Sequence, residues 1–273
     1  MSNDVLRATD IAYRRAGRDI LAGVSFVAHP GESVAITGPS GSGKTTLLTV
    51  LSGLEPPDRG DVQLGELRVH RAVDAAVRHR FGVVFQGYGL VSLLTAAENV
   101  ELVLQAGGTT GDEARERGRV LLAAVGLEDR ADHLVEELSG GEQQRVAVAR
   151  ALVGNPDVVL ADEPTAELDA ERRQLVLDLL LRAAHDGKIV VLVTHDDAVA
   201  DQCDRQVHIA DGRLVDDTRA LAVAATPVLP DVPEWQPRSA FEAAGPPTDR
   251  KAVPPRKTAA KPRQPRRKPA DPA

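Results

Sequence analysis

The sequence predicts an α/β fold whose core is a mostly parallel β-sheet. Three short apolar runs rich in β-branched residues support this prediction, at residues 32–37, 158–161 and 189–193. Because apolar and polar residues do not alternate in the latter two runs, they are typical of strands that helices bury on both faces. Helical spacing follows the runs, and we expect helices over residues 45–53, 171–185 and 197–203.

Two other parts of the chain indicate additions to this core. Between residues 92 and 153 the apolar residues follow a helical period, with Ala96, Val100 and Leu104 on one face, and no strand pattern intervenes. We therefore expect a helical subdomain inserted into the α/β core. The first 30 residues and residues 60–69 alternate between apolar and polar positions, which predicts an N-terminal antiparallel β layer beside the core.

Composition limits the class of protein. The chain has 273 residues in ordinary globular proportions, and its single cysteine, Cys203, excludes an internal disulfide and suits a reducing compartment. Residues 1–10 lack the apolar stretch of a secretory signal, and no apolar run reaches the roughly 18 residues that a membrane span needs. From the sequence we expect a soluble or peripheral protein of the cytoplasm.

The C-terminal part of the chain differs from the rest. Residues 227–273 contain 12 of the 18 prolines, ten basic and five acidic residues, and no helical or strand period. We therefore divide the chain into a folded domain, residues 1–226, and a Pro/Ala/Lys/Arg-rich disordered tail. A solvated tail is the favoured interpretation, and contact with anionic lipid headgroups or nucleic acid is the alternative. The folded part is acidic, so no specific nucleic-acid partner is expected.

A phosphate-binding loop is predicted by the segment GPSGSGKT, residues 38–45, between a predicted strand and a predicted helix. It fits the pattern G-x-x-x-x-G-K-[ST], in which backbone N–H groups and a helix N-terminus cradle nucleotide phosphates, a lysine reaches the β- and γ-phosphates and a hydroxyl ligates Mg²⁺. The motif alone leaves kinases, GTPases, helicases and transport motors open. The expected nucleotide contacts are Gly38, Pro39, Ser40, Gly41, Ser42, Gly43, Lys44, Thr45 and Thr46.

Acidic residues and a histidine follow the next two predicted strands. Asp162 ends the run VVLAD at the carboxyl edge of the sheet, where α/β proteins bind ligands, and would hold the Mg²⁺ shell. Glu163 directly follows, and we expect it to act as a general base on the attacking water. His195 follows the strand at residues 189–193 and would contact the γ-phosphate or that water.

The segment LSGGEQQRVAVARAL, residues 138–152, predicts a helix with an anion site at its start. Ser139 and Glu142 have the spacing of a capping box. Gly140 and Gly141 are poor helix formers, but they let another group approach the N–H donors at the positive end of the helix dipole. The sequence thus predicts a second phosphate-binding surface on a different part of the chain.

With GPSGSGKT, LSGGEQQRVAVARAL, VVLADEPTAELD and VTHD in this order, the chain resembles the ATP-binding subunit of an ABC transporter over roughly residues 5–215. The resemblance implies a P-loop NTPase core of the RecA-like type. It implies that Tyr13 stacks on adenine, with Tyr88 a weaker rival, and that Gln86 contacts Mg²⁺ and couples the core to the helical subdomain. Asp169 would lie at a dimer interface, and His195 would be the switch histidine.

The resemblance also implies an assembly. The signature loop, Ser139, Gly140 and Gly141 with Glu142, would meet the γ-phosphate of ATP on the P-loop of a second subunit, so that a head-to-tail homodimer sandwiches two nucleotides. Hydrolysis of Mg-ATP would then drive a separate integral membrane permease from the cytoplasmic face of the membrane. The segments VFQGYGLVSLLTAAENV and DEPTAELD most resemble the lipoprotein-release and macrolide-export branch.

Other functions stay open at this point. The ATPase could regulate a membrane complex by mechanotransmission without moving a solute, or act as a soluble ABC ATPase on chromosomes or ribosomes. The single P-loop and the lack of sustained heptads disfavour the latter, and the presence of Glu163 and His195 disfavours a scaffold without turnover. Glu167 departs from the family, since many relatives have a small residue or asparagine there. The extra carboxylate could alter dimer affinity, and we expect activity to survive.

Overall fold

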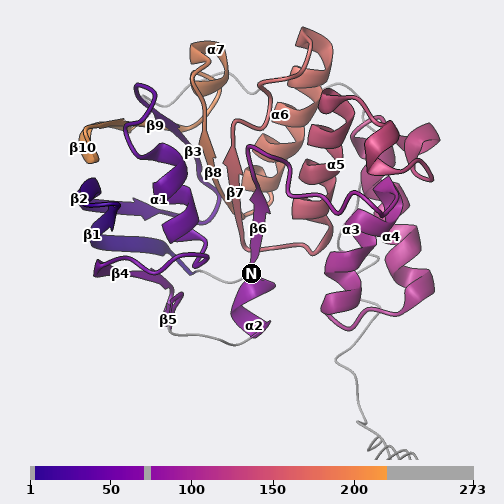
Figure 1. The fold of residues 1–273 in the computed structure, drawn as a ribbon, viewed down its shortest axis with the longest axis horizontal. Coiled ribbons are helices and arrows are strands. Elements are labelled where there is room, and N and C mark those ends of the chain that lie inside the picture. The colour runs from indigo at the N-terminus through magenta and orange to yellow at the C-terminus, as the bar shows by residue number, and fades with distance from the viewer. Residues whose placement is uncertain (1–3, 71–74, 220–273) are drawn as a thin grey trace, which may run out of the picture. The chain divides into compact units, whose positions relative to one another are not determined.

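The computed structural model describes residues 4–70 and 75–219, which form two β-sheets and the helices packed on them (Figure 1). The larger sheet has the strand order β10-β9-β3-β8-β7-β6. All neighbouring strands in it are parallel except β9 and β10, so the predicted mostly parallel sheet is confirmed. The strands are β3 (Ser33–Thr37), β6 (Phe81–Val84), β7 (Val158–Asp162), β8 (Ile189–Val193), β9 (Arg205–Ala210) and β10 (Arg213–Arg219).

Strands β3, β7 and β8 coincide with the three predicted runs, whereas β6, β9 and β10 were not predicted. β6 has only four residues and contains Gly82, which weakens a strand signal. A Cβ at Gly82 would collide with the carbonyl oxygen of Ala151, so glycine permits close packing of helix α5 (Gly140–Val153) on this strand. β9 and β10 form an antiparallel hairpin at the sheet edge, with buried and half-buried residues alternating along β9.

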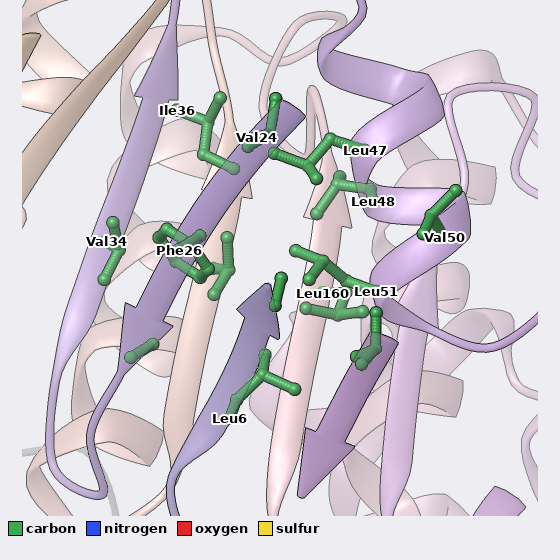
Figure 2. Close-up of a cluster of buried hydrophobic side chains, with 14 of the residues drawn as sticks. Leu6, Val24, Phe26, Val34, Ile36, Leu47, Leu48, Val50, Leu51 and Leu160 are labelled. Carbon is green, nitrogen blue, oxygen red and sulfur yellow. The ribbon is translucent and has the colours of Figure 1, made fainter. Parts of the chain in front are cut away.

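The second sheet is antiparallel, with the order β2-β1-β4-β5, and it confirms the predicted N-terminal β layer. Its strands are β1 (Leu6–Arg15), β2 (Arg18–Ala28), β4 (Arg59–Leu64) and β5 (Leu67–Arg68). Helix α1 (Lys44–Leu51) contacts β2 of this sheet and β7 and β8 of the other. Figure 2 shows Leu47 and Leu51 of α1 in one apolar cluster with Phe26 and Leu160, which come from the two sheets. This shared core fixes the position of α1 and of the loop that precedes it.

Helices occupy the segment between residues 92 and 153, where the helical period was found. They are α3 (Ala96–Ala106), α4 (Gly111–Ala124) and α5, with short 3-10 turns at Glu128–Arg130 and Val135–Glu137. The structure describes this whole segment, and its strand-like pairing is limited to one bridge between Thr95 and Leu134. α3 packs against α4 and α5, and α5 in turn contacts β6. The helical segment is thereby attached to the parallel sheet through α5.

The other helices of the described residues are α2 (Ala75–Arg78), α6 (Ala170–His185) and α7 (Asp197–Ala200). α7 ends before the predicted residue 203, and past its end the Asp204 carboxylate accepts hydrogen bonds from the N–H and the hydroxyl of Ser33, the first residue of β3. Across residues 4–70 and 75–219, no helix is both long and apolar enough to cross a membrane. The predicted tail, residues 227–273, lies outside the described residues, so the division of the chain at residue 226 stays a prediction.

Candidate nucleotide-binding site

Residues 38–43 connect the buried strand β3 to α1, and residues 39–41 at the tip of this loop are exposed. Gly43 is the N-cap residue of α1 with a φ of 103°, and no side chain caps the helix. A Cβ at Gly43 would lie 2.8 Å from the carbonyl oxygen of Ile20, so glycine suits both the backbone conformation and this contact. Since the first N–H groups of α1 lack a side-chain cap, the helix start is suited to binding an anion.

Lys44 bends over the loop that precedes it. Its ammonium group donates hydrogen bonds to the carbonyl oxygens of Gly38 (2.8 Å) and Pro39 (2.9 Å). Ser42 is buried within the loop, and Thr46 is half-buried in the first turn of α1. The loop therefore combines a held cation with an uncapped helix start, which is the combination that binds polyphosphates.

Thr45, Gln86 and Asp162 meet at a cavity of about 210 Å³ beside the loop. Asp162 is 5% exposed, and burial raises the pKa of its carboxyl group, while a hydrogen bond from Thr45 opposes that increase. Among the residues that the structure describes, no cluster of three or more His, Cys, Asp or Glu side chains could hold a metal ion alone. One carboxylate with hydroxyl and amide oxygens fits Mg²⁺ that is shared with a nucleotide, because this ion prefers few protein ligands and substrate phosphates.

Glu163 follows Asp162 in the left-handed backbone conformation, with a φ of 50°. Its N–H donates to the carbonyl oxygen of Val193 on β8 (3.0 Å), and its Oε1 lies 2.8 Å from Nδ1 of His195. This hydrogen bond raises the pKa of His195. The Glu163 side chain is only 14% exposed, whereas that of His195 is 72% exposed. A left-handed non-glycine residue is strained, and such strain is concentrated at active sites where surrounding contacts maintain it.

The predicted capping box is present at the start of α5. The Ser139 hydroxyl accepts a hydrogen bond from the N–H of Glu142 (3.3 Å), and the Glu142 carboxylate accepts one from the N–H of Ser139 (2.8 Å), which lowers the pKa of Glu142. A Cβ at Gly140 would collide with the Glu167 carboxylate and lie 3.3 Å from the Tyr88 hydroxyl. Glu167, which departs from the family pattern, thus covers Gly140 within the same chain.

Two further predicted residues lie on β1 and at the start of α6. Tyr13 pairs across the strands with Leu21, and a methyl group of Leu21 lies 3.0 Å from the position that a Cβ at Gly43 would take. Its hydroxyl donates a hydrogen bond to the Glu55 carboxylate. Asp169 caps α6, and its side chain is about half exposed. The stacking of Tyr13 on adenine therefore stays a prediction, and Asp169 is accessible to a partner.

Sequence reasoning missed two residues of α5 that connect parts of the site. The Gln144 side chain is hydrogen-bonded to backbone groups of Glu163 and Glu167, and the Arg150 guanidinium donates to the carbonyl oxygens of Tyr88 (2.8 Å) and Gly89 (2.5 Å). Both are polar residues on a helix that is otherwise largely buried. This pattern could have revealed them, because buried polar groups are almost always hydrogen-bonded.

A phosphate-binding loop at the carboxyl edge of a parallel sheet, with a cation site beside it, defines a P-loop nucleotide-binding protein. Residues 21–166 match the family model described as ABC transporter. The chain belongs to this family, and the resemblance inferred from its motifs is confirmed.

Curated relatives indicate the branch of the ABC transporter family to which the chain belongs. The chain is 43% identical over 212 residues to the lipoprotein-releasing system ATP-binding protein LolD 1 of Rhodopirellula baltica, a match that covers 75% of this chain and 92% of the relative. It is 41% identical over 228 residues to the macrolide export ATP-binding/permease protein MacB 1 of Yersinia pestis bv. Antiqua, covering 80% of this chain and 35% of the relative. The chain thus spans about a third of the length of the MacB relatives. These matches identify it as an ABC ATPase of the LolD and MacB branch.

A solved structure supports the same fold. The dimeric ATP-binding cassette MJ0796, in a post-hydrolysis state bound to ADP and Pi, superimposes with a TM-score of 0.74 at 37% sequence identity. The match covers 78% of this chain and 98% of that chain. The predicted P-loop NTPase fold class is therefore confirmed.

Proposed function

We propose that the chain is the ATP-hydrolysing motor subunit of an ABC transporter, and that it works as a homodimer on a separate membrane permease at the cytoplasmic face of the membrane. One observation carries the proposal: the phosphate-binding loop shares its site with Glu163 and His195, which are held 2.8 Å apart. Nucleotide binding alone does not require this pair, whereas hydrolysis requires a group that activates water.

Each part of the site has a role in this proposal. The uncapped start of α1 and the Lys44 ammonium group would bind the β- and γ-phosphates of ATP. Thr45, Gln86 and Asp162 would hold Mg²⁺, which neutralises phosphate charge when it is bound. Glu163 would accept a proton from the attacking water, an effect typically worth about 10²–10⁴-fold in rate. His195 would orient that water or the γ-phosphate.

A second copy would complete the site. The loop holds ATP from one side, and the anion-binding start of α5 lies on the helical part of the same chain. In a two-fold dimer, Ser139 and Gly141 of each subunit would face the γ-phosphate bound by the other, with Glu142 and Asp169 close to the interface. The dimeric state of the MJ0796 cassette supports this arrangement. Because ATP would bridge the two subunits, its hydrolysis would remove bridging charge and release mechanical work.

Exposed apolar side chains close to Gln86 in the sequence support the permease as partner. Phe85 is 39% exposed, Val91 42% and Leu93 82%. The segment that carries them is ordered by Asn99, whose buried carboxamide accepts from the N–H of Val91 (2.8 Å) and donates to its carbonyl oxygen (3.1 Å). We expect a helix of the permease to dock here. Leu93→Ser should reduce co-sedimentation of the chain with membranes from its source cells and leave its own ATPase rate intact, and unchanged sedimentation would contradict the docking.

Phosphate release tests the enzymatic role. Glu163→Gln should reduce turnover at saturating ATP by at least about 100-fold and leave ATP binding within about twofold, because the amide cannot accept the proton. Glu171→Gln is the matched control, since it removes an exposed carboxylate from the first turn of α6 and should keep the native rate. Native turnover by Glu163→Gln would overturn the role of Glu163 as the base, and no phosphate release by the native chain would overturn the enzymatic role itself.

A further inference from the structure

The loop that carries Glu163 is held by one side chain of α5. Gln144 is 4% exposed, and its Nε2 donates a hydrogen bond to the carbonyl oxygen of Glu163 (2.5 Å). Its Oε1 accepts a hydrogen bond from the N–H of Glu167 (3.2 Å). A single carboxamide therefore spans the loop from residue 163 to residue 167. A neutral amide is suited to this place, because it donates and accepts from one planar group.

The same contact supports the strained backbone of Glu163. Its N–H is held by Val193 of β8, and its carbonyl oxygen is held by Gln144 together with a weaker hydrogen bond from the N–H of Ala166 (3.3 Å). With φ at 50°, this conformation persists only if the surroundings fix it on both sides. The backbone conformation in turn sets the direction in which the Glu163 carboxylate points, toward Nδ1 of His195.

Gln144 also lies close to the start of α5. It is five residues after Ser139, which corresponds to roughly 7.5 Å along a helix at 1.5 Å per residue. The helix is rigid over this length, so a displacement of its first turn also moves the Gln144 side chain. This part of α5 therefore connects the surface that is proposed to meet the ATP of the second subunit with the loop that orients Glu163 in its own subunit.

We propose that Gln144 is a positioning residue for hydrolysis, which makes the orientation of Glu163 depend on the position of α5. The inference rests on the proposed role of Glu163 as the base. It adds that a displacement of the first turn of α5, which is proposed to meet the ATP of the second subunit, would reach Glu163 through the Gln144 carboxamide. Among the described residues, the side-chain hydrogen bonds of Gln144 go to Glu163 and Glu167, and Gln144 does not line the cavity of Thr45, Gln86 and Asp162.

Gln144→Met tests this inference, because methionine has a similar length and cannot make either hydrogen bond. We expect kcat to fall by about tenfold or more, part of the effect of a general base, while KM for ATP changes by less than about threefold. Gln143→Met is the matched control. Gln143 lies on the same helix and also donates to backbone carbonyl oxygens, those of Val135 and Leu138 (both 3.0 Å), so its loss should cost similar stability. Its kcat should stay within about twofold of native.

Two further variants separate the possible outcomes. In the Glu163→Gln background, Gln144→Met should cause no additional loss in single-turnover rate, since a residue that acts through Glu163 has nothing left to position. Gln144→Glu covers the case in which the methionine variant does not fold. An ionised carboxylate would repel the Glu163 carbonyl oxygen, whereas a protonated one could donate to it, so its kcat relative to native should rise as the pH is lowered.

The results distinguish this inference from the proposal on which it rests. Loss of turnover in Glu163→Gln together with equal kcat values for Gln144→Met and Gln143→Met would overturn the role of Gln144 and leave the base intact. Native turnover in Glu163→Gln would overturn both. A fall in kcat confined to Gln144→Met, absent in the Glu163→Gln background, is the result that the inference predicts.

Discussion

The glycines of the phosphate-binding loop allow a prediction whose size follows from the structure. Gly41 and Gly43 both have positive φ, 78° and 103°, so alanine at either position is strained by about 1–2 kcal/mol. They differ in their surroundings. A Cβ at Gly41 meets nothing within 4 Å, whereas a Cβ at Gly43 would lie 2.8 Å from the Ile20 carbonyl oxygen and 3.0 Å from a methyl group of Leu21. Overpacking of this kind costs a further 1–3 kcal/mol, approximately.

Gly43→Ala should therefore be less stable than Gly41→Ala by about 1–3 kcal/mol, with a total loss of about 2–5 kcal/mol. The comparison is clean, because alanine restricts the unfolded chain equally in both variants and this contribution cancels. Urea unfolding followed by circular dichroism at 222 nm measures the difference. Equal free energies of unfolding for the two variants would refute the close contact between the loop and β2.

Other predictions concern individual charges. Lys44→Ala should weaken binding of ATP by about 10- to 150-fold, because it removes charge-assisted hydrogen bonds of about 1.5–3 kcal/mol, and calorimetric titration showing native affinity would contradict the phosphate role. The pKa of His195, followed by NMR, should fall in Glu163→Gln, because the hydrogen bond that raises it is weakened. Because the pKa of His195 is raised in the folded state, the Glu163–His195 pair stabilises the fold at pH below about 6.5, and this contribution is lost as the pH rises through the folded-state pKa. An unchanged pKa of His195 in Glu163→Gln would count against the contact. Glu167→Ala should lower the dissociation constant of the ATP-dependent dimer by about fivefold, because no carboxylate then covers Gly140 beside the incoming phosphate. Sedimentation at several protein concentrations measures this constant, and an unchanged value would contradict the prediction.

Much of the site could be predicted from the sequence, because its motifs are local. The loop at residues 38–45 depends on residues next to one another, and the capping box of Ser139 and Glu142 depends on a spacing of three. The strands β7 and β8 were recognisable because burial on both faces leaves an unbroken apolar run. In each case the physical cause of the structure lies within a few residues of its effect.

The features that the sequence did not predict depend on contacts between distant segments. The left-handed backbone of Glu163 reflects contacts with β8 and α5, and no property of the glutamate itself indicates it. The sequence shows that Glu167 is unusual, but its position over Gly140 depends on how the segment after β7 lies against the start of α5. Strand β6 was not predicted because it contains Gly82, a residue that disfavours strands and is needed here for the close packing of α5.

The mass of the chain in the presence of ATP tests the central claim most directly, namely that two copies hold ATP between them. We expect Glu163→Gln at saturating Mg-ATP to sediment at twice the chain mass of 29.0 kDa, and to return to the monomer when ATP is replaced by ADP. Gly141→Glu in the same background, which adds a carboxylate at the start of α5, should remain monomeric while still binding ATP. A monomer of Glu163→Gln at saturating Mg-ATP would contradict the account.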